Sequence, residues 1–550
     1  MEYREYMQLV ERKLNQMTNE EKYQWIYEYA RRIDKTQRLD FLQCLNILTK
    51  KDIEFDENEF LDFIENIKNE NLYFSLEYED YYDEIYHDWE EERIYIDSMS
   101  ISSSLKKYIQ VAYDYMYEKD YLKAYNILDT IFMLEFFILD DNYGFDDHYT
   151  FNDLIYHDIL DIDIRDYYRS YIYCAMQVSA DCQKIYDMFD HYKETLLLTD
   201  ILSFGPEEMN IDMFIDQWIE FLMGITKDKA ALLLIDACLY IGHIDKLLQI
   251  ARQSYLIHPS LYKEVCQRYL LQNNLDEALR IAYEALSKIP PNRIIRSQIA
   301  DMLLKYYPND SYLLKEAFLS HPTAFHCIRA YNQINNIQSM KEEFMQRDYS
   351  SKETISFELQ SPNLIDDEKR LYEFLLGENQ KVINICMDDH HALGWSYSLK
   401  GKIIPILLML FKPENPTYRA DMNLLRDIQN KIKFQTEEDI NFVDYFYQWK
   451  KKYVISNDCK EQYIEWITKE IDIRAEAVVG EGHRKSYHKS ADEIIVLGEI
   501  LLSLGQINDL TLFVEKYKKK YSTKRAFKTE INERLELYVQ YSIENQGESL

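Results

Sequence analysis

Leu271-Gln-Asn-Asn-Leu-Asp-Glu-Ala-Leu-Arg-Ile-Ala282 decides the fold, because Tyr240-Ile-Gly-His-Ile-Asp-Lys-Leu-Leu-Gln-Ile-Ala251 repeats its plan. Asp245 and Asp276 are 31 residues apart, and the apolar positions that follow them coincide. In the second copy these apolar residues fall on one face of a 3.6-residue period: Leu275, Ala278, Leu279 and Ile281. Each copy predicts the end of one helix, a tight polar turn and the start of a second helix. A helix–turn–helix unit repeated at this spacing is typical of a stacked helical array.

Related units occur elsewhere in the chain. Lys119-Asp-Tyr-Leu-Lys-Ala-Tyr-Asn-Ile-Leu128 places Ala124 where the opening stretch has Ala278, a small residue that lets two helices approach closely. Leu376 to Cys386 and the turn at Leu504 to Asn508 follow the same plan. Units of this kind therefore extend from the first quarter of the chain to its end.

The scarcity of turn-forming residues also favours helices. The 550 residues include only 12 Gly and 10 Pro, and no Gly precedes Gly144 and no Pro precedes Pro206. Strand-rich folds need such residues every ten or so positions. We therefore expect an all-α fold with helix above about 60% and almost no strand, well beyond the usual third.

Cysteine usage and hydropathy indicate the compartment. The eight cysteines are scattered and form no Cys-x-x-Cys motif, which is typical of reduced cysteines in a cytoplasmic protein. No run approaches the roughly 18 apolar residues of a membrane-spanning helix. The first residues are charged and lack the apolar core of a secretion signal. We expect a cytoplasmic protein.

The charge is unevenly distributed. Residues 51–200 contain 37 Asp and Glu against 11 Lys and Arg, a balance of −26 out of a net charge of −33. The segment Lys516 to Lys528 has seven basic residues and no acidic one. Duplex nucleic acid and anionic membranes would be repelled by the first region, so neither is expected as a partner. The basic segment could bind a phosphate backbone or make a charge contact within or between chains.

Composition and breaks divide the chain into five parts. Residues 1–50 read as a helical module, in which Thr18 and Glu21 fit a capping box. An acidic, aromatic-rich helical region follows over 51–220, with 51–98 interpreted as an aromatic-packed helix with a solvated acidic face or a poorly ordered insertion. The alternative for 51–98 is a nucleic-acid mimic. The remaining parts are a helical-repeat region over 221–412, a C-terminal helical region over 413–540, and a frayed tail over 541–550.

The loop from Asp140 to Asp163 is the one stretch that resembles a metal site. Its candidate ligands are Asp146, Asp147 and His148. The many carboxylate oxygens of this loop suit Ca²⁺ or Mg²⁺. The spacing does not follow the EF-hand pattern. A solvated acidic turn with Asp caps on a helix from about Phe151 is favoured, and no metal or other cofactor is expected.

Two other clusters have the residue types of a binding or catalytic site. Arg484, Tyr487 and His488 stand at i, i+3 and i+4, on one helical face, and form the candidate binding patch. The alternative is a polar cap that anchors the helix after it. Cys386 near His390 and His391 has the residue types of a thiol–imidazole pair, but its apolar helical position favours a core cysteine. No catalytic residue is predicted.

Two resemblances are carried by these residues. The repeated units resemble tetratricopeptide repeats, which implies a superhelix (an α-solenoid). Three places resemble the helical region of bacterial SWIM zinc-finger proteins. They are Gly394-Trp395 with the apolar stretch after Lys402, the stretch from His483 to Glu499, and Tyr521 to Phe527. That family's finger needs Cys-x-Cys, which this chain lacks, so zinc binding is not carried over.

Three functions follow as hypotheses. The first is a non-enzymatic scaffold or adaptor that binds a protein or peptide on a helical-repeat surface. The second is an acidic decoy or regulator of a basic, nucleic-acid-handling protein. The third is a metal-dependent hydrolase that uses the Asp140–Asp163 loop.

Overall fold

The computed structural model describes residues 3–34, 41, 53–83, 88–140, 147–179, 181–207, 209–350, 356–391, 397–413, 415–435 and 440–538. Most of these residues lie in helices, as predicted. A four-stranded sheet also occurs, so the expectation of an all-α fold is wrong in this respect. The chain divides into two compact units, Met1–Leu261 and Tyr262–Leu550, and the division falls within the predicted 221–412 region. None of the described helices combines the length and the apolar character that crossing a membrane requires.

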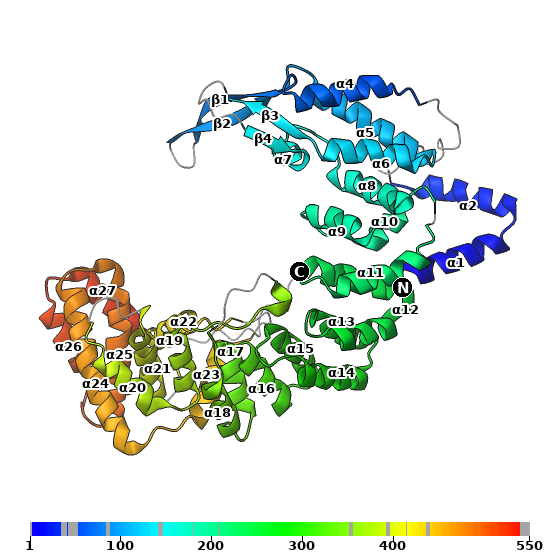
Figure 1. The fold of residues 1–550 in the computed structure, drawn as a ribbon. Coiled ribbons are helices and arrows are strands. Elements are labelled where there is room, and N and C mark those ends of the chain that lie inside the picture. The colour runs from blue at the N-terminus through cyan, green and yellow to red at the C-terminus, as the bar shows by residue number, and fades with distance from the viewer. Residues whose placement is uncertain are drawn as a thin grey trace. The chain divides into compact units, whose positions relative to one another are not determined.

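In the first unit, helices precede the strands of a sheet along the chain, separate the second strand from the third, and follow the fourth (Figure 1). They are α1 (Tyr3–Gln16), α2 (Asn19–Arg32), α4 (Glu57–Lys68), α5 (Ile101–Tyr117), α6 (Tyr121–Phe132), α7 (Phe151–Tyr156), α8 (Ile164–Val178), α9 (Cys182–His191), α10 (Leu198–Phe204), α11 (Asp212–Met223) and α12 (Asp228–Ser254). The capping box predicted at the start of α2 is confirmed. The Thr18 hydroxyl accepts from the Glu21 N–H, and the Glu21 carboxylate accepts from the Thr18 N–H.

The sheet consists of β1 (Phe74–Asp83), β2 (Asp88–Ile96), β3 (Glu135–Leu139) and β4 (Asp147–Thr150), in the order β2-β1-β3-β4. The pairings β1–β2 and β3–β4 are antiparallel, and β1–β3 is parallel. Helix α4 packs on β3 and α7 packs on β4. The helix expected over 51–98 is therefore confirmed only for α4, and strands replace it after Tyr73.

The reason for the strands is a two-residue alternation. Phe74 and Leu76 are buried, whereas Glu77 and Glu79 are exposed, so one face of β1 meets the core and the other meets water. In β3, Phe136 and Ile138 alternate in the same way. A helix would spread these apolar side chains around its circumference and leave the core face incomplete.

The turns of the predicted units are confirmed by their backbone. Each has a residue with positive φ just after the first helix of the pair, where the chain turns towards the second helix. These residues are Lys119, His243, Asn273, Gly377 and Gly505. At Gly242 and His243 the backbone leaves helical values and divides α12 into two helices. Asn274 then caps the next helix by accepting from the Glu277 N–H.

The second unit is built from helices (Figure 1). They are α13 (Ser260–Leu271, across the division), α14 (Leu275–Lys288), α15 (Ile294–Leu304), α16 (Ser311–Ser320), α17 (Ala324–Gln333), α18 (Gln338–Gln346), η2 (Phe357–Leu359), α19 (Asp366–Leu375), α20 (Asn379–Asp388), α21 (Leu399–Phe411), α22 (Arg419–Lys431), α23 (Phe442–Lys452), α24 (Asn457–Ala475), η4 (Glu476–Gly480), η5 (Arg484–Ser486), α25 (Tyr487–Ser503), α26 (Leu510–Lys520) and α27 (Arg525–Arg534).

Successive helices of this unit pack on one another. Helix α15 packs on α14 and α16, and α16 in turn packs on α17. Ala278 of α14 is fully buried, which is where the repeat predicts a small side chain. The apolar helix α21 is buried along almost its whole length, as its sequence predicts. The core of the unit therefore runs from one helix pair to the next.

Candidate functional site

A concave site with a volume of about 910 Å³ lies in the second unit. We call it the α15–α19 groove, because its lining includes Ile294 at the start of α15 and Glu368 and Tyr372 of α19. The other contributions come from the turn between α16 and α17, the segment 360–364, and the residues that follow α22. The lining mixes apolar, amide, hydroxyl and charged side chains, so it offers shape together with several hydrogen-bonding groups.

The segment 360–364 is fixed at both ends. The Ile294 N–H donates to the Gln360 carbonyl at 3.0 Å, and the Leu364 N–H donates to the Tyr349 carbonyl at 3.1 Å. Arg293 donates to the Leu359 carbonyl as well. Between these anchors, the backbone N–H groups of Ser361 and Asn363 have no hydrogen-bond partner among the described residues. The segment therefore presents two available donors from a rigid support.

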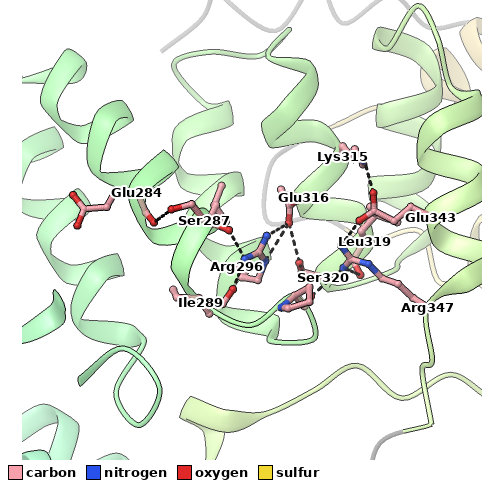
Figure 2. A network of polar contacts seen from close by, with 12 residues as sticks. Glu284, Ser287, Ile289, Arg296, Lys315, Glu316, Leu319, Ser320, Glu343 and Arg347 are labelled. Carbon is pink, nitrogen blue, oxygen red and sulfur yellow. Dashed lines mark hydrogen bonds and ion pairs between the residues drawn. The ribbon is translucent and has the colours of Figure 1, made fainter. Parts of the chain in front are cut away.

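A buried polar network holds the helices beneath the groove (Figure 2). The Arg296 guanidinium donates to Glu316 Oε2 from Nε at 3.1 Å and from Nη2 at 2.5 Å. Its Nη1 donates to the carbonyls of Leu286 and Ile289, each at 2.5 Å, at the end of α14. The side chains of Arg296 and Glu316 are only 5% and 6% exposed. The network therefore ties α14, α15 and α16 together.

A second branch of the network reaches α18 (Figure 2). Arg347 donates to the carbonyls of Pro291 and Leu319 at 3.0 and 3.1 Å, and it pairs with Glu343. Lys315 of α16 pairs with the same Glu343 at 2.6 Å. These contacts fix the turn before α15 and the end of α16, and both lead directly into residues that line the groove.

Several polar side chains of the groove make hydrogen bonds or ion pairs with other residues of the protein. The Thr323 hydroxyl caps α17 by accepting from the His326 N–H, and Arg293 donates to the Ser361 hydroxyl at 3.4 Å. Burial, with the neighbouring His326, lowers the pKa of His321. At the rim, Lys433 and Glu368 form an ion pair at 3.3 Å. The geometry favours recognition of a ligand through shape and hydrogen bonds.

The three residues of the predicted binding patch lie in different environments. Arg484 is exposed in the short 3₁₀ turn η5. Tyr487 is buried, and its ring meets the Phe527 ring edge-on at a centroid distance of 5.8 Å. His488 lines a separate cavity of about 270 Å³ between α22, α25 and α27, which we call the α22–α25 cavity.

The predicted metal ligands are placed as follows. Asp146 lies outside the described residues. Asp147 and His148 are in β4, where the Asp147 carboxylate accepts from the His148 N–H and the His148 ring lies 3.2 Å from Glu70. The helix predicted from about Phe151 is confirmed as α7, but its N-cap is Thr150, which forms a capping box with Asp153, and strand β4 precedes it in place of an acidic turn. No group of three or more His, Cys, Asp or Glu that could hold a metal occurs among the described residues.

The remaining sequence candidates lie in the core or make contacts with their neighbours on the surface. Cys386 is buried, and burial raises the pKa of its thiol to about 12. The His391 ring contacts Asp389 at 2.8 Å. In the basic segment, Tyr517 donates to Asp472 at 2.6 Å and Lys520 pairs with Glu476 at 2.9 Å. Lys520 of that segment therefore makes an ion pair with η4, and Tyr517 makes a hydrogen bond with α24.

Sequence reasoning missed the two acidic residues of the α22–α25 cavity. Asp492 and Glu493 are both buried in α25. Their signal was available, because two adjacent carboxylates interrupt an otherwise apolar run in Ala491-Asp-Glu-Ile-Ile-Val-Leu497. Burial raises the pKa of Asp492 to about 8, and the neighbouring Arg534 and Asn423 offset only part of that rise.

Searches against known protein families, curated proteins and solved structures found no match to this chain.

The raised pKa of Asp492 predicts how stability depends on pH. Its folded-state pKa of about 8 exceeds the ordinary value near 4, so the folded protein retains a proton that the unfolded chain has lost. The protonated carboxyl therefore adds to the free energy of unfolding at low pH, and this addition falls by about 1.4 kcal/mol for each unit as the pH rises towards 8. Asp492→Asn should remove this dependence on pH. Between about pH 6 and about pH 7.5, the variant should therefore gain roughly 2 kcal/mol relative to the wild type.

The measurement is denaturant unfolding of the full chain at the two pH values, followed by the transition midpoint. Asp444→Asn, an exposed position on α23, is the matched control and should keep the wild-type dependence on pH. Equal pH dependence in Asp492→Asn and the wild type would show that the buried carboxyl is not protonated in the folded state.

Proposed function

We propose that this protein is a non-catalytic scaffold that binds an extended peptide segment of a partner protein in the α15–α19 groove. The observation that carries the proposal is the anchored segment 360–364, with its two available N–H donors at the edge of a cavity of about 910 Å³. Paired helices closed by positive-φ turns support a tetratricopeptide-like superhelix as the body of the scaffold. The localisation proposed with this function is cytoplasmic.

The geometry of the segment suits pairing with an extended chain. Gln360 and Ile365, on either side, have extended backbone angles. Pro362 has a fixed φ and disfavours helical angles at Ser361, so the segment stays extended. Donors two residues apart, as in Ser361 and Asn363, point to the same edge of an extended chain. A partner strand can accept from both, as peptides do when they add to an exposed edge.

The size and the lining of the groove support the same occupant. Pockets that enclose drug-sized ligands have volumes of about 300–1,000 Å³, so this groove has room for a short run of peptide side chains. Tyr372 and Ile294 provide apolar contact, whereas Lys433 and Glu368 place charge at the rim. Recognition would then depend on main-chain hydrogen bonds for affinity and on the side pockets for specificity.

The proposal predicts that blocking the groove abolishes peptide binding. Peptides selected from a random display library against the full chain should bind with a measurable Kd. Asn363→Trp, at an exposed position in the groove, should raise that Kd at least roughly tenfold, equivalent to about 1.4 kcal/mol. The indole fills the space and hinders approach to the segment.

Asn335→Trp provides the matched control, since Asn335 is an exposed asparagine in the loop between α17 and α18 and does not line the groove. Its Kd should equal that of the wild type. If the selected peptides bind Asn363→Trp as tightly as they bind Asn335→Trp, the groove is not their site and the proposal fails.

A second candidate function, an acidic surface for a basic partner, is favoured by the register of β1 and β2. Glu79 and Glu92 are both exposed and stand directly opposite each other. Like charges directly opposite each other destabilise a strand pair, and no ion pair to either carboxylate occurs in the part of the chain that the structure describes. A basic partner would relieve the repulsion between them. This observation supports the acidic regulator as the alternative to the scaffold.

The alternative predicts a salt-sensitive interaction. A lysine-rich peptide should bind the full chain at about 0.05 M salt and weaken sharply near 0.3 M, where exposed charges are screened within several ångströms. The double change Glu79→Gln and Glu92→Gln should weaken binding further. The matched control, Glu57→Gln with Glu65→Gln on α4, removes the same charge from exposed positions. If both double variants weaken peptide binding equally, the interaction depends on the net charge of the protein and not on the paired glutamates of β1 and β2.

A further inference from the structure

The α22–α25 cavity is independent of the groove and has a distinct chemistry. Its lining comes from three helices and is polar: Asn423, Arg426, Asp427 and Asn430 from α22, His488, Lys489, Asp492 and Glu493 from α25, and Arg534 from α27. The volume is about 270 Å³, which suits a small molecule and excludes a folded segment of protein.

Every acidic residue in the lining already has a cation beside it. Lys431 Nζ lies 2.5 Å from Asp427 Oδ2, and Arg534 Nε lies 2.9 Å from Asp492 Oδ1. Arg474 Nε lies 3.2 Å from Glu493 Oε2. Arg534 also pairs with Glu530 of its own helix. The negative charge of the lining is therefore compensated within the walls.

Two lining cations have no such compensation. Neither Arg426 nor Lys489 has an ion-pair partner among the residues that the structure describes. Arg426 is exposed and Lys489 is half-buried. Burial lowers the pKa of His488, and the positive charge of Arg534 and Lys489 lowers it further. Arg426 and Lys489 are thus left without a counter-charge in a chain whose net charge is −33.

We propose that the α22–α25 cavity binds a small organic dicarboxylate. Two carboxylates balance the two uncompensated cations, and guanidinium groups match the geometry of carboxylates through paired N–H donors. Arg534 has a further N–H group, Nη2, without a hydrogen-bond partner among the described residues. The side-chain amides of Asn423 and Asn430 provide additional donors for carboxylate oxygens.

The same lining disfavours inorganic phosphate. Phosphate concentrates its charge on one centre, whereas Arg426 and Lys489 belong to different helices, α22 and α25. A dicarboxylate spreads its charge over two ends, so that each end can pair with one of the two cations. The charge distribution therefore selects an extended dianion over a compact one.

The test is isothermal titration of the full chain with succinate and with glutarate at about 0.05 M ionic strength, where surface charge is little screened. At least one of the two should bind with a Kd below about 1 mM. Succinamide, which has the same skeleton without charge, and inorganic phosphate should bind at least roughly tenfold more weakly. The double change Arg426→Gln and Lys489→Gln should raise the dicarboxylate Kd at least tenfold.

Arg525→Gln with Lys528→Gln is the matched control, because these residues have the same types and the same exposure and lie outside the cavity. Its affinity should equal that of the wild type, and the melting temperatures of both variants establish that they are folded. Absence of binding by either dicarboxylate, tighter binding of phosphate or succinamide, or equal weakening by the two double variants would each overturn the proposal.

Discussion

The buried guanidinium of Arg296 is the constraint on which the second unit depends. A charge that is almost fully removed from water is tolerated only when a counter-charge and hydrogen bonds replace its hydration. Glu316 supplies the counter-charge, and the carbonyls of Leu286 and Ile289 accept from Nη1. These partners come from the ends of α14 and from α16, so α15 can dock only when both neighbours are in place.

The groove follows from this arrangement. Its rim residues Ile294 and Thr323 come directly after segments that the network fixes, and Arg347 extends the network to the Pro291 carbonyl. The anchored segment 360–364 then closes one side. The α22–α25 cavity follows a similar rule elsewhere in the unit, where Arg474 and Arg534 lie beside the buried carboxyl groups of Glu493 and Asp492. Buried charges in this protein occur where helix pairs meet.

Much of the fold could be predicted from local patterns, and the candidate sites could not. The turn at Asn273 and Asn274 was visible because left-handed and capping positions select asparagine, which marks them in the sequence. The strands around Phe74 were missed because tyrosines and carboxylates obscured a short two-residue alternation. The α15–α19 groove draws its lining from five separated segments, so no single stretch of sequence contains its signal. Only the acidic pair at Asp492 and Glu493 left a local trace.

The most direct test of the central claim is the coupling free energy between Arg296 and Glu316. Glu316→Leu should cost about 3–5 kcal/mol of unfolding free energy, because it leaves a buried charge without its partner. Adding Arg296→Met should recover a large part of that loss, giving a coupling energy of at least about 2 kcal/mol in a double-mutant cycle. The exposed pair Glu465 and Lys469, changed in the same way, should show a coupling below about 1 kcal/mol. Additive costs for Arg296 and Glu316 would contradict the account, because the two residues would then contribute to stability independently.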